Sequence, residues 1–134
     1  MSRNKRILAV DDDEELLELY AAKLGALGFE VSTLSGTQGV LDRIREFRPD
    51  LILMDVMMPG QDGISLTRSL RSDGETADIP ILVVSALADA ATLNDALLFG
   101  AADYLVKPFG LEDLKRKVDR ALSVSERRRA RSKQ

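Results

Sequence analysis

Short apolar runs alternate with longer segments of helical periodicity along almost the whole chain of 134 residues. Each apolar run has the length and the continuous apolarity of a strand that is buried on both faces. Such runs separated by helices are typical of repeated strand–helix units, in which helices cover both sides of a parallel sheet. The pattern therefore predicts an α/β fold, a single doubly wound domain with five strands and five helices.

Turn and capping residues indicate where the expected elements begin and end. Asp13 and Asp89 are natural N-caps for the helices that follow them, and Gly28 and Gly100 stand where two helices are expected to stop. The run 29–34 mixes valine and leucine with glutamate, serine and threonine, which favours a strand at the edge of the sheet. We expect strands at 7–10, 29–34, 51–54, 81–84 and 104–106, and helices at 14–27, 36–47, 64–71, 90–100 and from 111 to about 122.

The composition excludes several kinds of chemistry. Apolar residues make up 45% of the chain and charged residues 31%, which is typical of a globular protein rather than a disordered one. Without cysteine or histidine there is no disulfide, no thiolate or imidazole metal site, and no phosphohistidine. Catalysis would have to use carboxylates, hydroxyls or lysines. No apolar stretch is long enough for a membrane helix or a signal-peptide core, so we expect a cytoplasmic protein with no membrane partner.

Charge is distributed unevenly along the chain. Residues 1–114 contain 10 Lys and Arg against 20 Asp and Glu, a net charge of −10, whereas residues 115–134 contain 9 against 2, a net charge of +7. The apolar stripe of the last expected helix ends at Leu122, and the residues after it have nothing to pack on the sheet. We therefore expect one domain over residues 5–122 and a basic tail or linker over residues 123–134, with a frayed end of the last helix as an alternative.

Three aspartates follow two of the buried runs. Asp11 and Asp12 come directly after the first run, and Asp55 comes directly after the third. If these two strands are neighbours in one parallel sheet, three carboxylates meet at its carboxyl edge, where open parallel sheets bind ligands. Such a pocket repels itself unless a divalent cation or shared protons relieve the charge, and hard oxygen ligands suit Mg²⁺, with Mn²⁺ as an alternative ion. Ser85 and Lys107 follow the fourth and fifth strands and add a hydroxyl and a cation able to meet a phosphate oxygen.

Four motifs carry these acids, the hydroxyl and the lysine: Val10-Asp11-Asp12, Met54-Asp55-Val56-Met57-Met58-Pro59-Gly60, Val84-Ser85-Ala86 and Tyr104-Leu105-Val106-Lys107-Pro108-Phe109. On these motifs the chain resembles the receiver domain of bacterial two-component response regulators, over about residues 5–122. The resemblance implies a flavodoxin-like fold with strand order 2-1-3-4-5. It also implies that Asp55 accepts a phosphoryl group from a histidine kinase, a phosphotransfer protein or a small phosphodonor. The implied ligands of Mg²⁺ are Asp11, Asp12, Asp55 and the backbone carbonyl of Met57.

The resemblance further implies how phosphorylation would change the surface of the domain. Ser85, Ala86 and Lys107 would bind the phosphate, Tyr104 would turn inward, and the face formed by helix 4, strand 5 and helix 5 would be remodelled. The Lys107–Pro108 peptide bond would be cis. Such a domain is a switch rather than an enzyme, although it assists its own phosphorylation and dephosphorylation. Its other partners would be an effector domain or protein and, once phosphorylated, a second copy of the chain. Nucleic acid would be reached only through a separate output domain.

Two other functions use similar residues. A phosphatase of the haloacid dehalogenase type also has an aspartate nucleophile and Mg²⁺, and its Asp-x-Asp motif could be Asp11–Asp13. However, Glu14 and Glu15 stand where that family needs a hydroxyl. A flavodoxin-like cofactor binder is excluded because the acidic segment 11–15 would repel the flavin phosphate. The sequence leaves open whether the chain acts alone, as a relay intermediate or as part of a longer regulator.

Overall fold

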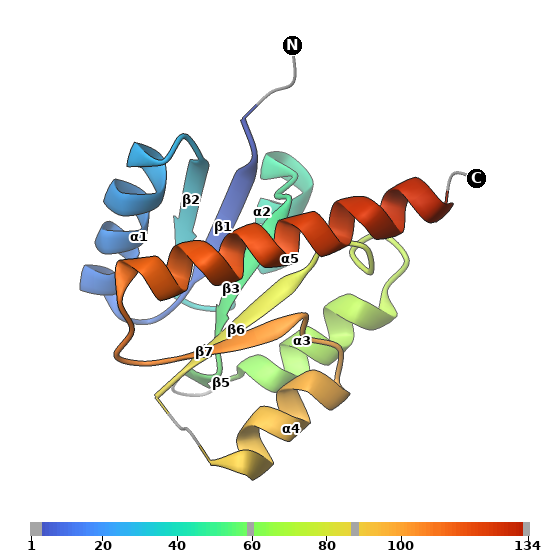
Figure 1. The fold of residues 1–134 in the computed structure, drawn as a ribbon. Coiled ribbons are helices and arrows are strands. Elements are labelled where there is room, and N and C mark those ends of the chain that lie inside the picture. Colours follow the sequence, from blue (N-terminus) through green and yellow to red (C-terminus); the bar gives the residue numbers. More distant parts are fainter. Residues whose placement is uncertain (1–3, 59–60, 87–88, 133–134) are drawn as a thin grey trace.

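The structure is a computed structural model, and it describes residues 4–58, 61–86 and 89–132. It is built on a sheet of five parallel strands in the order β2-β1-β3-β6-β7, which corresponds to 2-1-3-4-5 for the five expected strands (Figure 1). The predicted doubly wound α/β fold is therefore confirmed. The strands are β1 (Arg6–Val10), β2 (Glu30–Leu34), β3 (Leu51–Asp55), β6 (Ile81–Ser85) and β7 (Asp103–Val106).

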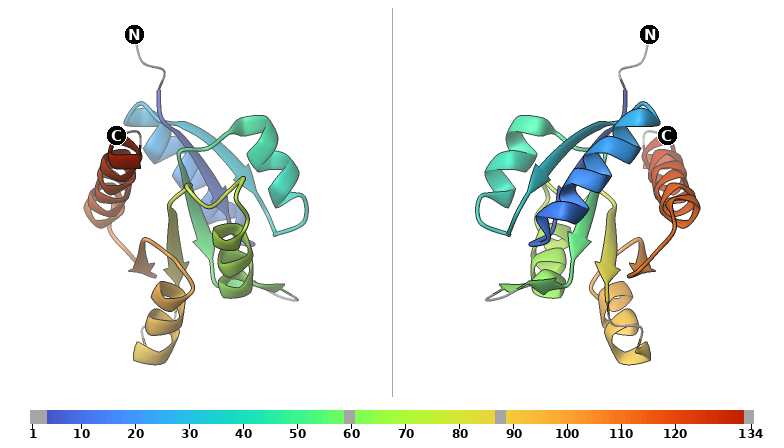
Figure 2. Two further views of the ribbon diagram at one scale, coloured as in Figure 1. Left: turned by 90° about the vertical axis from the view of Figure 1, so that its right-hand side faces the viewer. Right: turned by 90° about the vertical axis from the view of Figure 1, so that its left-hand side faces the viewer.

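In the part of the chain that the structure describes, five helices cover the two faces of this sheet. Two of them, α1 and α5, lie on one side, while α2, α3 and α4 lie on the other (Figure 2). Each side has its own apolar core, formed by the inward stripe of its helices and one face of the strands. The helices are α1 (Glu14–Ala26), α2 (Val40–Phe47), α3 (Gly63–Ser72), α4 (Ala90–Leu98) and α5 (Leu111–Ser132).

The central strands are apolar at every position because both of their faces are covered. In β1, Ile7 and Ala9 contribute to the core under α1 and α5, whereas Leu8 and Val10 contribute to the core under α2, α3 and α4. These four side chains are at most 1% exposed. Successive side chains of a strand point to opposite faces, so a strand between two helical layers needs apolar residues throughout. The edge strand β2 is only partly buried, as its mixed sequence predicts.

Capping residues set the starts of two helices as predicted. The Asp13 carboxylate accepts hydrogen bonds from the backbone N–H groups of Glu15 and Leu16 at 3.0 and 3.3 Å, and Asp89 accepts one from Thr92 at 3.0 Å. The predicted start of the second helix, at residue 36, was wrong. This helix begins at Val40, because Gly39 has a left-handed backbone conformation with φ of 81° that cannot continue a right-handed helix.

Two further features differ from the sequence expectations. Residues 57–58 and 61–62 form a short antiparallel pair, β4 (Met57–Met58) and β5 (Gln61–Asp62), whose connecting residues Pro59 and Gly60 lie outside the described residues. The last helix does not end near Leu122 but continues to Ser132. This extension contains neither glycine nor proline, and Glu126 pairs with Lys5 at 2.8 Å. The division into a domain over 5–122 and a tail over 123–134 stays a prediction.

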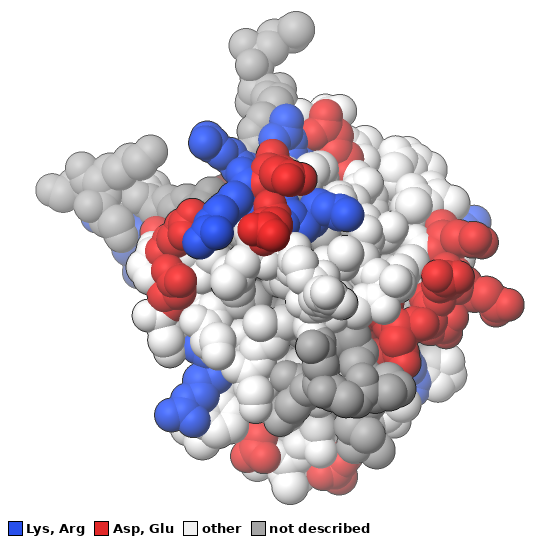
Figure 3. Space-filling view, turned by 180° about the vertical axis from the view of Figure 1, so that it is seen from behind, with Lys and Arg blue, Asp and Glu red and all other residues white. Residues whose placement is uncertain are grey.

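The surface of the described residues is strongly acidic around the start of α1. Seen from behind, acidic side chains gather on the side of the molecule where α1 lies (Figure 3). The exposed acids at the start of α1 are Asp12, Asp13, Glu14, Glu15 and Glu18.

Among the helices that the structure describes, none combines the length and apolarity needed to cross a bilayer.

Candidate functional site

The predicted acidic residues lie together because of the register between β1 and β3. Val10 of β1 pairs with Met54 of β3, so the next residues, Asp11 and Asp55, lie side by side at the carboxyl edge of the sheet. Strand β2 lies on one side of β1 and strand β3 on the other, and open parallel sheets bind ligands at such a reversal. Asp12 is adjacent to Asp11, and one carboxylate oxygen from each of the three aspartates lies within 4.8 Å of the others.

Two of these three carboxylates are buried. The exposed fraction is 0% for Asp11 and 3% for Asp55, while Asp12 is exposed and connects the cluster to solvent. A buried carboxylate needs hydrogen bonds or an opposite charge to remain ionised. Asp11 receives one hydrogen bond from the backbone N–H of Asp13, at 2.9 Å from its Oδ1.

Lys107 supplies the opposite charge from the end of β7. Its Nζ lies 2.9 Å from Asp11 Oδ2 and 3.7 Å from Asp55 Oδ1. Burial acts to lower the pKa of Lys107, but the hydrogen bond and charge of Asp11 and the charge of Asp55 outweigh it, so that the pKa is raised. Lys107 is therefore a fixed cation held mainly by Asp11. The Lys107–Pro108 peptide bond is cis.

The remaining charge imbalance favours a divalent cation. Among the described ion pairs, Lys107 is the ammonium group that faces these three carboxylates, so these four groups together are negative when all are ionised. Hard divalent cations prefer carboxylate, carbonyl and water oxygens, and the donor set of Asp11, Asp12 and Asp55 is made of such atoms. The residues present therefore fit Mg²⁺ or Mn²⁺.

Ser85 and Ala86 stand at the same edge, at the end of β6. Ser85 is 0% exposed and pairs with Val106 of β7, and the backbone N–H of Lys107 donates to the Ser85 carbonyl at 2.8 Å. Asp55 pairs with the residue just before Ser85 in the register between β3 and β6. The hydroxyl, the lysine and the acids therefore converge on one edge, and Ala86 follows as an exposed residue.

Two predicted residues occupy different surroundings. Tyr104 lies on β7 against α5, where the Nζ of Lys117 is 5.0 Å from the centroid of its ring. Lys117 in turn pairs with Asp103 at 3.0 Å. Tyr104 is half-buried there and is not a member of the acidic cluster. Met57 begins β4 two residues after Asp55, so its backbone lies in the segment that leaves the acidic edge.

Two residues at this site were not recognised from the sequence. A Cβ placed on Gly63 would meet the carbonyl oxygen of Asp55 and the Cα of Val56, so only glycine fits this close approach. The sequence shows Gly63 merely as a turn residue. Tyr20 is a buried residue of α1, and its ring stacks on Phe109 beside the Lys107 segment. No sequence pattern connects positions so far apart.

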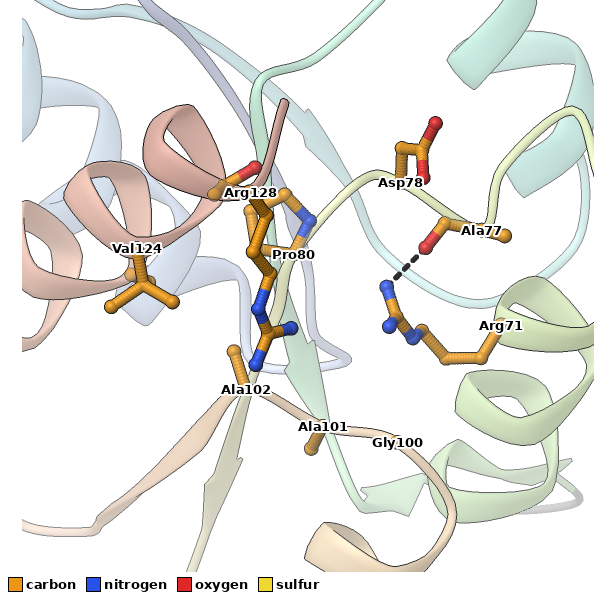
Figure 4. Close-up of a pocket in the computed structure, with 11 residues that line it drawn as sticks. Arg71, Ala77, Asp78, Pro80, Gly100, Ala101, Ala102, Val124 and Arg128 are labelled. Atoms are coloured by element: carbon orange, nitrogen blue, oxygen red, sulfur yellow. Dashed lines mark hydrogen bonds between the residues drawn. The ribbon is translucent and has the colours of Figure 1, made fainter. Parts of the chain in front are cut away.

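A cavity of about 390 Å³ lies away from this edge, among the loops before β6 and β7 and the second half of α5. Figure 4 shows the Arg71 guanidinium donating a hydrogen bond to the Ala77 carbonyl at its wall, with Arg128 of α5 on another side. None of the acidic residues of the candidate site lines it. The cavity is therefore separate from the acidic edge.

Comparison with known proteins identifies the family. The sequence model of the response regulator receiver domain matches residues 7–119. The chain is 38% identical over 122 residues to the DNA-binding response regulator MtrA of Mycolicibacterium smegmatis, covering 91% of this chain and 52% of that protein. It is 43% identical over 109 residues to the response regulator MprA of Mycolicibacterium vanbaalenii, covering 81% of this chain and 46% of that protein. The chain thus spans about half the length of these relatives.

Solved structures agree with this assignment. The receiver domain of the Francisella response regulator 1452 superposes with a TM-score of 0.82 at 30% identity, covering 91% of this chain and 99% of that one. A CheY-like receiver domain protein from Methanospirillum hungatei superposes with a TM-score of 0.85 at 27% identity, covering 93% and 98% of the two chains. With the fold, the acidic edge and the sequence match in agreement, the chain belongs to the response regulator receiver domain family.

Proposed function

We propose that this chain is a phosphorylation-activated signalling switch in which Asp55 accepts the phosphoryl group. The observation that carries the proposal is the position of the Asp55 carboxylate, which is buried at the carboxyl edge of the sheet beside the other two acids and 3.7 Å from the Nζ of Lys107. The donor would be a partner histidine kinase, a phosphotransfer protein or a small phosphodonor such as acetyl phosphate. The chain contains no histidine and cannot itself be a phosphohistidine donor.

Metal binding is part of this proposal. Asp11, Asp12 and Asp55, with the backbone carbonyl of Met57, would hold Mg²⁺ or Mn²⁺. When bound, the cation would offset the negative charge that accumulates when a phosphoryl group approaches three carboxylates. The exposed Asp12 supports this, because it leaves the cluster open to solvent from which the ion arrives.

The chemistry is the transfer of one phosphoryl group to a carboxylate. A carboxylate oxygen of Asp55 attacks phosphorus and forms a new O–P bond, while the bond from phosphorus to the donor nitrogen or oxygen breaks and its electron pair stays with the donor. Lys107, already 3.7 Å from Asp55 Oδ1, is placed to pair with an oxygen of the transferred group. The chain thereby assists its own phosphorylation without being an enzyme that releases a product.

Ser85 and Ala86 would bind the added phosphate, and Tyr104 would change its position in response. We propose that the Ser85 hydroxyl and the Ala86 backbone N–H donate to the phosphate, since Ser85 ends β6, the strand that pairs with β3, and Ala86 follows it. Tyr104 would then leave its position beside Lys117 and turn inward, changing the surface of α4, β7 and α5. An effector domain or protein, or a second phosphorylated copy, would bind that surface. Nucleic acid would be contacted only through an output domain, as the name of the relative MtrA suggests.

The phosphatase alternative is less well supported by the site. It requires Asp13 as the second acid of an Asp-x-Asp motif, but Asp13 caps α1 and is not in the cluster of Asp11, Asp12 and Asp55.

Incubation with acetyl phosphate and Mg²⁺ distinguishes the switch from the phosphatase. A switch stops at one phosphoryl group per chain, and chelation of the metal prevents the labelling. Continuous turnover of a generic phosphate monoester, with no labelled chain, would contradict the proposal.

A further inference from the structure

Tyr20 of α1 is not explained by packing alone. Its side chain is 1% exposed, and its hydroxyl has no hydrogen-bond partner among the described residues. A buried polar atom without a partner destabilises a fold, and phenylalanine would fill the same space without that penalty. The hydroxyl therefore suggests a role beyond the core.

The direction of the side chain brings this hydroxyl toward the acidic edge. Tyr20 packs among residues of the core beneath α1, and side chains on a helix lean toward the helix N-terminus. The N-terminus of α1 follows Asp13, next to the acidic cluster. Burial raises the pKa of the Tyr20 phenol, and the charges of Asp11, Asp55 and Asp13 raise it further. The phenol is therefore a neutral hydrogen-bond donor within the field of these carboxylates.

The ring of Tyr20 has a second contact that leads to the same site. It stacks on the ring of Phe109, with the centroids 6.2 Å apart and an angle of 8° between the planes. Phe109 comes two residues after Lys107, whose Nζ lies beside Asp11 and Asp55. A stacked aromatic pair restricts how far either segment can shift. Helix α1 thus holds the segment that carries the lysine.

We propose that Tyr20 is a positioning residue for the phosphorylation of Asp55. Its ring, through Phe109, keeps Lys107 beside the carboxylates. Its hydroxyl has no hydrogen-bond partner among the described residues and would be available as a neutral donor on the buried side of the acidic cluster. The inference rests on the proposed function of Asp55. It assigns to this chain a contact between α1 and the segment after β7 that sets the geometry of the site.

Two Tyr20 variants and one control variant of the chain test this inference. The measurement is the initial rate of labelling by acetyl phosphate over a range of Mg²⁺ concentrations. Tyr20→Phe keeps the ring, so we expect its maximal rate to stay near that of the wild type. Loss of the hydroxyl should raise the Mg²⁺ concentration for half-maximal labelling by about three- to ten-fold. Tyr20→Leu also removes the stacked ring, and its maximal rate should fall by about ten-fold or more because Lys107 is displaced.

The matched control is Leu24→Val, which alters a side chain that is 0% exposed, one turn further from the acidic edge on the same helix. It should lower the temperature of unfolding while leaving both labelling parameters unchanged. Titration calorimetry of Mg²⁺ without a phosphodonor provides an independent readout, and Tyr20→Phe should bind the ion more weakly than the wild type.

The outcomes distinguish this inference from the function on which it rests. If the wild type is labelled on Asp55 and both Tyr20 variants match it in labelling and in Mg²⁺ binding, Tyr20 is only a core residue and the inference is overturned. If the wild type is not labelled at all, the proposed function fails and the inference falls with it.

Discussion

At the scale of single residues, Lys107 places a positive charge beside two buried carboxylates. Asp11 and Asp55 are almost fully buried, and Lys107 is the ammonium group within 4 Å of both among the described ion pairs. Removing a partner from a buried charged pair leaves the remaining charge without compensation. The stability of the fold and the chemistry of the site therefore depend on the same side chain.

We predict that Lys107→Met lowers the free energy of unfolding by about 1–3 kcal/mol and that saturating Mg²⁺ restores part of this loss. Urea denaturation with and without the metal measures both effects. The control is Lys117→Met, because Lys117 also pairs with an aspartate at 3.0 Å and has the same exposed side-chain fraction of 23%. Its loss should cost about 0–1 kcal/mol and should not depend on Mg²⁺. Equal metal dependence in the two variants would contradict the account.

The raised pKa of Lys107 predicts how this contribution varies with pH. A pKa that is higher in the folded chain than in the unfolded one stabilises the fold fully below the unfolded value of 10.5. The contribution disappears as the pH rises through the still higher pKa of the folded protein. The difference in unfolding free energy between the wild type and Lys107→Met should therefore be constant from neutral pH to about pH 10 and shrink above it. A difference that grows with pH would be inconsistent with this ion pair.

Gly63 leads to a prediction about the loop that follows the acceptor. Gly63→Ala places a Cβ against the backbone of Asp55 and Val56, so we expect a loss of about 1–3 kcal/mol in stability and slower labelling of Asp55. Gly74→Ala is the matched control, since Gly74 has open space around it. Thermal unfolding and acetyl phosphate labelling measure both changes. Equal behaviour of the two variants would show that the close approach at Gly63 does not matter.

At the scale of elements, strands were more predictable than helix ends. The runs at β1, β3, β6 and β7 were located to within one residue, because strands covered on both faces must be continuously apolar. The start of α2 was predicted wrongly because the left-handed conformation of Gly39 does not show in the spacing of apolar residues along the sequence. The length of α5 past Leu122 could not be predicted from periodicity, because its last turns have no apolar stripe. The two-residue strands β4 and β5 are too short to show a pattern.

The site could be predicted where chemistry follows directly from strand ends. Asp11 and Lys107 follow β1 and β7, and Asp55 and Ser85 end β3 and β6. The order of these four strands brings their ends to one edge. The stacking of Tyr20 on Phe109 could not be predicted, because it joins α1 to the segment after β7 and depends on how the two pack in three dimensions. The space restriction at Gly63 is equally invisible in the sequence.

The start of α1 carries a prediction at this scale. Asp13→Ala removes the acceptor for two backbone N–H groups and should lower the free energy of unfolding by about 1 kcal/mol. Asp13→Asn retains a capping oxygen and should recover most of that stability. Chemical denaturation of the three chains measures the series. Full labelling of Asp55 in Asp13→Ala is also expected, because the Asp13 side chain caps a helix and is outside the acidic cluster. Loss of labelling would show that this side chain is needed for the phosphorylation of Asp55 and would contradict the account.

At the scale of the whole molecule, the proposed phosphorylation site and the proposed partner-binding surface lie in different parts of the receiver fold. The acids and Lys107 lie at the carboxyl edge of the sheet, whereas α4, β7 and α5 form an adjoining side of the domain (Figure 1). The sheet connects the two because Ser85 pairs with Val106 and Val83 pairs with Tyr104. A structural change that a phosphate causes at Ser85 could therefore reach Tyr104 through the adjacent strands β6 and β7.

The most direct test of this account is mass-spectrometric mapping of the modified residue after incubation with acetyl phosphate and Mg²⁺. We predict a single phosphoryl group on Asp55 in the wild type, none in Asp55→Asn, and wild-type labelling in Asp42→Asn, which changes an exposed aspartate on α2. A wild type that remains unmodified, or an Asp55→Asn chain labelled to the same extent, would contradict the central claim that the buried carboxylate of Asp55 is the phosphoryl acceptor.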